Sequence, residues 1–152
     1  MLIVDDDPSI VKLLGRVCAG DGHETALYSV PEQALQHVAE HPLDLLVTDL
    51  AMPSMDGITV MRKAQQLQPS LFTLIITGHA GAFPIEDVLI DGNADVMFKP
   101  FHMNELRARI ALAERRKKVI DALEDERRAL QTVSTEMIQG LQTELAELRG
   151  GR

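Results

Sequence analysis

The stretch LDLLVTDLAMPSMDGITVMRKAQQL, residues 43–67, contains a strand, a polar strand end and a helix. Leu43–Thr48 is apolar except at Asp44 and Thr48, which predicts a mostly buried strand. Gly57–Leu67 repeats its apolar residues at helical spacing. Asp49 lies between them, directly after the strand. This stretch therefore predicts a strand–loop–helix unit with an acid at the carboxyl end of the strand.

The same alternation of strand and helix patterns continues through the first 112 residues. Five strands alternating with five helices predict a parallel sheet covered on both faces, because each right-handed crossover lays its helix on the sheet. The other strands are expected at Leu2–Val4, His23–Tyr28, Leu71–Ile76 and Ala94–Phe98. The other helices are expected to begin at Pro8, Pro31, Pro84 and Met103.

Composition limits the class of protein. The chain has 152 residues, of which 45% are hydrophobic and 25% charged, as in a globular domain with a modest extension. Its apolar runs are too short to span a bilayer, and its first residues do not resemble a signal peptide. The single cysteine, Cys18, falls within the apolar pattern of the first helix, which predicts a buried thiol. A cytoplasmic location without membrane contact is expected.

Charge is unevenly distributed along the chain. Residues 1–112 contain 15 acidic and 7 basic residues, a net charge of −8, whereas residues 113–152 contain 8 of each. Affinity for nucleic acid depends on basic residues that neutralise phosphates. The one basic cluster, Arg115–Lys118, is followed by acids at helical spacing and is interpreted as a solvated helix face. No contact with nucleic acid is expected.

Polar residues gather at the predicted carboxyl ends of four strands, where ligands bind in such sheets. They are Asp5-Asp6-Asp7, Asp49, Thr77-Gly78-His79 and Lys99-Pro100. Neighbouring carboxylates repel one another, and a magnesium ion with one or two carboxylates, waters and a phosphoryl oxygen would relieve this. A single acid at a strand end is more often a helix cap, and this role is expected for Asp7 and Asp56.

These residue types suit phosphoryl transfer. Asp49 can act as a carboxylate nucleophile, as in aspartyl-phosphate chemistry. Lys99 can pair with one phosphoryl oxygen, and the Thr77 hydroxyl can donate to another. In this chemistry the protein mainly positions groups and neutralises charge.

Residues 1–112 resemble the receiver domain of two-component signalling. The resemblance rests on the motifs LIVDDD (Leu2–Asp7), VTDLAMPSMDG (Val47–Gly57), IITGHA (Ile75–Ala80) and FKP (Phe98–Pro100). It implies a flavodoxin-like, doubly wound sheet with a cis peptide bond at Lys99–Pro100. It also implies phosphorylation by a sensor histidine kinase or a phosphotransfer protein, with slow self-catalysed dephosphorylation rather than turnover as an enzyme.

The resemblance also implies a role for each residue of the site. Asp49 corresponds to the phosphoacceptor. Asp5 and Asp6 correspond to an acidic pair that binds magnesium together with Asp49 and the backbone carbonyl of Ala51. Asp6 is expected to contact the metal directly and Asp5 mainly through a water. Thr77 and Lys99 correspond to the switch hydroxyl and the phosphate-binding lysine.

Two departures from the family pattern stand out. Val96 occupies the position, three residues before the lysine, where the family often has an aromatic that turns inward on activation. His79 and Ala51 lie where family members differ in dephosphorylation rate. His79 is interpreted either as a residue at the rim of the site or as a gate for water.

Residues 113–152 are expected to extend the last helix beyond the domain. The pattern predicts one helix from Met103 to Leu148, about 65–70 Å long at 1.5 Å per residue. Its apolar stripe is Val119, Leu123, Leu130, Val133, Met137, Leu141, Leu145 and Leu148. The spacing slips from a strict heptad, Glu126 and Arg127 interrupt the stripe, and Gly140 weakens it. A homodimeric coiled coil is expected, against a helix folded back on its own domain, a frayed helix or a linker to an absent output domain.

Two other functions remain open from the sequence. One is a docking module with a receiver fold that works as a dimer without phosphorylation, which the complete set of polar strand ends disfavours. The other is a magnesium-dependent phosphatase of related fold. That chemistry uses a second acid two residues after the nucleophile, where this chain has Ala51.

Overall fold

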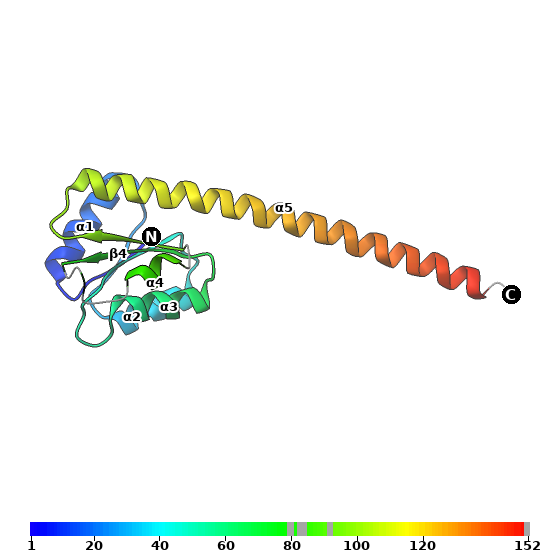
Figure 1. Ribbon diagram of the computed structural model, residues 1–152, viewed down its shortest axis with the longest axis horizontal. Coiled ribbons are helices and arrows are strands. Elements are labelled where there is room, and N and C mark those ends of the chain that lie inside the picture. Colours follow the sequence, from blue (N-terminus) through cyan, green and yellow to red (C-terminus); the bar gives the residue numbers. More distant parts are fainter. Residues whose placement is uncertain (79–80, 82–84, 91–92, 151–152) are drawn as a thin grey trace. The chain divides into compact units, whose positions relative to one another are not determined.

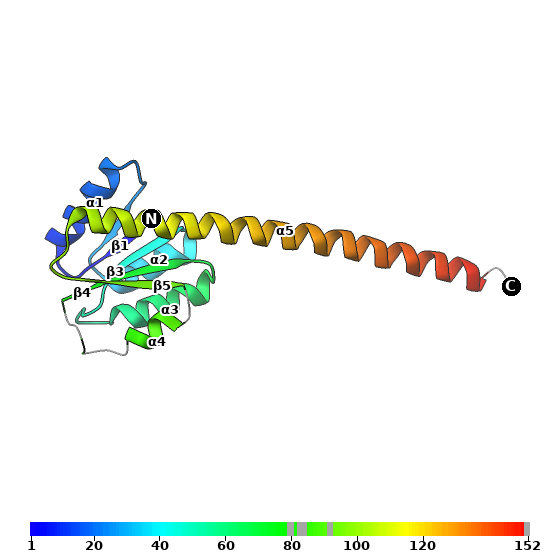
Figure 2. The same ribbon diagram turned by 45° about the horizontal axis from the view of Figure 1, so that its top comes forward.

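The computed structural model describes residues 1–78, 81, 85–90 and 93–150. Its sheet has five parallel strands in the order β2-β1-β3-β4-β5 (Figures 1 and 2). The strands are β1 (Leu2–Val4), β2 (Ala26–Tyr28), β3 (Leu45–Asp49), β4 (Phe72–Thr77) and β5 (Ala94–Phe98). The helices are α1 (Pro8–Gly20), α2 (Pro31–Glu40), α3 (Gly57–Leu67), α4 (Ile85–Ile90) and α5 (Met103–Gly150). This confirms the predicted doubly wound sheet with a long final helix.

The helices cover both faces of the sheet. On one face, α1 and the first part of α5 pack Leu14, Cys18, Leu106 and Ile110 over the central strands. On the other face, α2, α3 and α4 cover the sheet (Figure 2). The central strands β3 and β4 are buried along their whole length, which explains their continuous apolar sequences. Cys18 is buried, as predicted.

Two strand boundaries differ from the sequence prediction. β2 begins at Ala26 rather than His23, because only its last three residues pair with the short strand β1. The His23 amide instead donates back to the Cys18 carbonyl at the end of α1. β3 begins at Leu45 rather than Leu43, whose amide donates to the side chain of Gln68. Both errors come from contacts with residues outside the strand pattern.

The chain divides into two compact units, Met1–Lys117 and Lys118–Arg152. The first contains the sheet. The described part of the second, residues 118–150, is helical throughout, and the residues of its apolar stripe are all exposed. In the described part of the chain, no helix is both long enough and apolar enough to cross a membrane.

Candidate functional site

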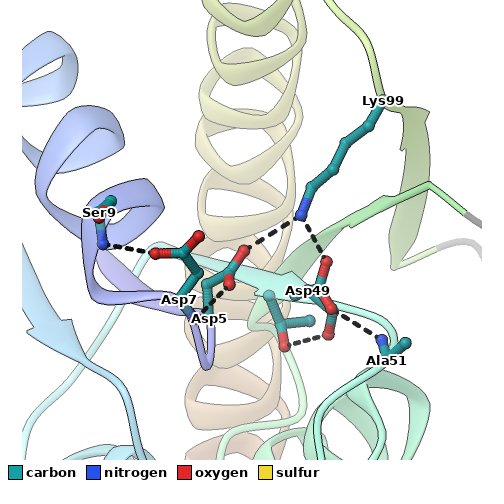
Figure 3. Close-up of polar contacts among 7 residues, drawn as sticks. Asp5, Asp7, Ser9, Asp49, Ala51 and Lys99 are labelled. Carbon is teal, nitrogen blue, oxygen red and sulfur yellow. Dashed lines mark hydrogen bonds and ion pairs between the residues drawn. The ribbon is translucent and has the colours of Figure 1, made fainter.

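Three strand ends bring Asp5, Asp49 and Lys99 together at one edge of the sheet (Figure 3). Asp5 follows β1, Asp49 ends β3, and Lys99 follows β5. The Lys99 ammonium Nζ lies 2.8 Å from Asp49 Oδ1 and 3.3 Å from Asp5 Oδ2. Both carboxylates are almost fully buried, with 3% of Asp5 and 8% of Asp49 exposed. One lysine therefore serves as the counter-ion of two buried acids.

Each of the two carboxylates uses its oxygens in the same way. Asp5 Oδ1 accepts a hydrogen bond from the Asp7 amide at 2.9 Å, which leaves Oδ2 for Lys99. Asp49 Oδ2 accepts from the Ala51 amide at 2.8 Å, which leaves Oδ1 for Lys99. The amides fix the rotamers of both acids, so their second oxygens converge on the same point.

Burial and charge act in opposite directions at these groups. Desolvation by burial raises the pKa of Asp5, and the Asp49 charge adds to the increase, although the Asp7 amide and Lys99 partly offset it. Burial alone would lower the pKa of Lys99. The hydrogen bond from its ammonium to Asp49 and the charges of Asp5 and Asp49 outweigh burial, so its pKa is raised. Lys99 is therefore held as a cation between the two acids.

Thr77 ends β4 next to this group. Its side chain is fully buried, its residue pairs with Phe98 in β5, and its carbonyl accepts from the Lys99 amide at 2.8 Å. This hydrogen bond extends the β4–β5 ladder by one residue and joins the backbone of Thr77 to that of Lys99. The cis peptide bond expected at Lys99–Pro100 is present.

The remaining predicted residues lie around this centre. Asp6 and Ala51 are exposed, and Asp6 makes no hydrogen bond or ion pair to another described residue. Asp7 caps α1 through the Ser9 amide, as predicted. Asp56 caps α3 through the Thr59 amide, also as predicted. His79, interpreted from the sequence as a rim or gating residue, lies outside the described residues.

Val96, at the position where the family often has an aromatic, is buried with Ile75 of β4 and Val88 of α4. The exposed aromatic of β5 is Phe98, two residues later. A valine has no ring that could swing between an outward and an inward position. Any response at Thr77 must therefore use another path.

One residue of the site was missed by sequence reasoning. Gly57, the first residue of α3, donates its amide to the Leu50 carbonyl at 2.8 Å. A Cβ added at this position would lie 3.0 Å from the Asp49 carbonyl carbon and closer still to the Asp49 oxygen. Only glycine therefore allows α3 to begin against the backbone of Asp49. The signal in the sequence was a glycine directly after the capping acid Asp56.

The donor chemistry of this edge fits a magnesium ion. Within the described residues, no three His, Cys, Asp or Glu side chains are arranged to hold a metal ion by themselves. Magnesium needs only one or two carboxylates, because waters and substrate oxygens complete its shell. Two buried carboxylates beside the exposed Asp6 match this requirement, with Lys99 balancing their charge in the metal-free form.

Comparison with known proteins agrees with this geometry. Residues 1–111 match the model of the response regulator receiver domain. The chain belongs to the response-regulator receiver family. It is thus the receiver domain of a two-component response regulator over this range, and the resemblance seen in the sequence is confirmed.

Relatives and solved structures place this receiver in several protein architectures. The transcriptional regulatory protein ZraR of Escherichia coli O157:H7 is 33% identical over 122 residues, which are 80% of this chain but only 28% of that protein. The response regulator receiver protein CpdR of Brucella abortus is 32% identical over 106 residues, 70% of this chain and 88% of CpdR. A receiver-domain crystal structure from Clostridium thermocellum superposes with a TM-score of 0.71 at 26% identity, covering 78% of this chain and 96% of that one.

Proposed function

We propose that Asp49 accepts a phosphoryl group from a phosphohistidine of a sensor kinase or phosphotransfer protein, in a magnesium-dependent reaction. The observation that carries the proposal is the buried Asp49 carboxylate, held by the Ala51 amide with its Oδ1 at 2.8 Å from Lys99. This acid has a fixed orientation and a cation beside it, at the sheet edge where ligands of this fold class bind.

The reaction exchanges one bond to phosphorus for another. The P–N bond of the donor breaks as a bond forms between phosphorus and a carboxylate oxygen of Asp49. Lys99 stays with the transferred group and pairs with one of its oxygens, and the Thr77 hydroxyl donates to a second. Slow hydrolysis by water returns Asp49 to its free form. Turnover of an external substrate, as in an enzyme, is not part of the proposal.

Asp6, Asp49 and the backbone carbonyl of Ala51 are the proposed direct ligands of the magnesium ion, with Asp5 acting through a water. The bound ion would supply positive charge against the phosphoryl oxygens. The exposure of Asp6 and Ala51 supports this division, because both can be reached from solvent, whereas Asp5 is 3% exposed. Lys99 would then give up its contact with Asp5 and keep the one with Asp49.

Intact-mass analysis after incubation with a small phosphodonor and magnesium tests the phosphoacceptor. One added phosphoryl group is expected on the parent and none on Asp49→Asn. The matched control is Asp44→Asn, which changes an exposed acid just before the same strand and should leave the modification unchanged. Modification of Asp49→Asn to the parent's stoichiometry would refute the assignment.

Titration of magnesium tests the ligands separately. Asp6→Ala is expected to weaken magnesium binding, because it removes a direct oxygen ligand. Asp44→Ala serves as the control for the loss of one negative charge. Equal affinity in Asp6→Ala and the parent would show that the ligand assignment is wrong.

We further propose that the second unit, residues 118–152, joins two copies of the chain through its apolar stripe. Exposed apolar side chains at helical spacing support a partner helix. Sedimentation equilibrium of the full chain should show a dimer, and Leu130→Asp should dissociate it by placing a charge in the seam. A parent chain that stays monomeric at high micromolar concentration would contradict this proposal.

The phosphorylation signal is proposed to leave through α5. Its residues Leu106, Ile110 and Ala113 pack on the sheet, so a shift of the neighbouring strand ends reaches them through the core. Phosphorylation should then change the solution scattering profile of the dimer more than its dissociation constant. Nucleic acid is not a proposed ligand, because residues 1–112 carry a net charge of −8.

A dimeric docking module that works without phosphorylation is the alternative, and the exposed stripe is the observation that favours it. The two functions differ in one measurement. If the parent dimerises but takes no phosphoryl group in the presence of magnesium, the docking module is the better reading.

A further inference from the structure

The apolar stripe of α5 is interrupted by charge at one level in its middle. Its apolar residues each expose between 54% and 75% of their surface, from Val119 to Leu148. Between Leu123 and Leu130 the stripe contains Glu126 and its neighbour Arg127 instead of an apolar residue. A helix that is apolar along one side except for one adjacent acid–base pair has a built-in marker of register.

The surrounding charges are paired within the helix, and this pair is not. Arg128 lies 3.2 Å from Asp125 and 3.6 Å from Glu124, one turn earlier on the same helix. Among the described residues, neither Glu126 nor Arg127 makes a hydrogen bond or an ion pair. The charges beside the stripe are thus satisfied locally, whereas the two charges in the stripe are left for a partner.

We propose that the partner is a second copy of this chain, aligned parallel and in register, with Glu126 of each helix against Arg127 of the other. The positions 123, 126, 130, 133 and 137 follow the 3,4 spacing of a coiled-coil seam. In a parallel pair each seam residue faces its own copy and also packs against the residue that follows that copy. Glu126 therefore meets Arg127 of the second copy, and symmetry repeats the contact.

An antiparallel pair would lose this complementarity. Glu144 lies 18 residues after Glu126, which is five turns of 3.6 residues, so both acids lie on the same side of the helix. When two stripes running from 119 to 148 overlap fully in opposite directions, residue 126 lies opposite residue 141, within one turn of the other Glu144. Arg127 then lies opposite Gly140. Two pairs of acids would meet in the seam, with no base facing them.

This inference rests on the proposed dimer and adds its direction and register. Ion pairs of this kind contribute little to affinity, but charged or polar residues in a seam select one alignment over others. In an alternative register, Glu126 would face apolar residues and lose its counter-ion. The pair therefore acts mainly as a register lock, and the apolar residues supply the attraction.

Charge reversal with a compensating swap tests the contact. Sedimentation equilibrium of Glu126→Arg and of Arg127→Glu should each show a dimer weakened about tenfold, because two opposite-charge contacts become like-charge contacts. The double swap, Glu126→Arg with Arg127→Glu, should return to within about threefold of the parent. The matched control is Glu124→Arg with Arg128→Glu, an exchange just outside the stripe, which should leave the dimer unchanged.

A thiol at the end of the stripe tests the direction. Leu148→Cys should form a disulfide-linked dimer under mild oxidation if the helices are parallel. An antiparallel pair would hold these two positions about 44 Å apart, at 1.5 Å per residue over 29 residues. The parent, whose single cysteine Cys18 is buried, is the control and should not cross-link.

Each outcome decides a different claim. Cross-linking at position 148 together with rescue by the swap supports the parallel, in-register pair. A stable dimer without the cross-link, or without rescue by the swap, overturns this inference and leaves the proposed dimer standing. A chain that is monomeric at every concentration overturns both, while phosphorylation of Asp49 is measured independently and is unaffected.

Discussion

Replacing Gly57 with alanine should damage the site more than any other single methyl group added at a described glycine. The new Cβ would lie 3.0 Å from the Asp49 carbonyl carbon, 3.1 Å from Leu50 Cα and closer still to the Asp49 oxygen. These are backbone atoms of a fully buried strand end, so no side chain can rotate away to make room. Either α3 or the end of β3 must move.

The size of the effect follows from the atoms involved. Overpacking by one carbon in a well-packed interior costs about 1–3 kcal/mol, and a clash with backbone on both sides belongs at the upper end. The Gly57 amide also donates to the Leu50 carbonyl, so moving α3 weakens a hydrogen bond that is worth about 1 kcal/mol. We expect a loss of about 3 kcal/mol in the free energy of unfolding. Displacing a reacting group by about 1 Å can reduce its rate about 100-fold.

Two other glycines provide the controls. At Gly15 a Cβ would meet only the side chain of Leu27, which is 41% exposed and can turn aside, so Gly15→Ala should cost less. At Gly140 it would meet nothing within 4 Å, and Gly140→Ala should stabilise the helix by up to about 1 kcal/mol. Urea unfolding gives the order of stability, and intact mass gives the rate of phosphorylation. A Gly57→Ala chain as stable and as quickly phosphorylated as the parent would refute the packing argument.

Three further changes should alter stability for separate reasons. Thr73→Val should raise the free energy of unfolding by about 1 kcal/mol, because the buried Thr73 hydroxyl has no hydrogen-bond partner among the described residues. Urea unfolding measures it, and a loss of stability would contradict it. Gln68→Glu should cost about 1–3 kcal/mol in the same assay, since the amide NH2 donates at 2.6 Å to the carbonyls of Val38 and His41 and a carboxylate cannot. Burial, and then the charge of His41, lowers the pKa of His37. The unfolded chain therefore binds that proton first, and stability should fall as the pH drops through the ordinary histidine range. His37→Gln should make the urea midpoint less dependent on pH between about 7.5 and 5.5, and an unchanged pH dependence would count against it.

The sheet and the position of its site were predictable because apolar periodicity and strand order determine them together. β3 and β4 are apolar along their length because helices cover both faces, and this pattern is visible in the sequence. Once the strands are parallel, their carboxyl ends lie at one edge, so the convergence of Asp5, Asp49 and Lys99 follows.

The sequence did not reveal how the side chains share their contacts. Which oxygen of Asp49 faces Lys99 depends on the turn that brings the Ala51 amide to the other one. The close approach of Gly57 to Asp49 depends on where α3 begins in space, which no residue pattern records. The start of β3 was misjudged for a similar reason, because the Gln68 side chain that binds the Leu43 amide is 25 residues away in the sequence.

The apolar stripe of α5 also ties the length of the tail to its rotational phase. Val119 and Met137 are 18 residues apart, as are Leu130 and Leu148, so the pattern closes on itself after five turns of a straight helix. Inserting or deleting 18 residues would return the stripe to the same side, whereas a change of seven would rotate it by about 20°. A domain joined after Gly150 would therefore keep its orientation to the stripe only across tails that differ by such steps. The spacing of this helix, as well as the identity of its residues, is under physical constraint.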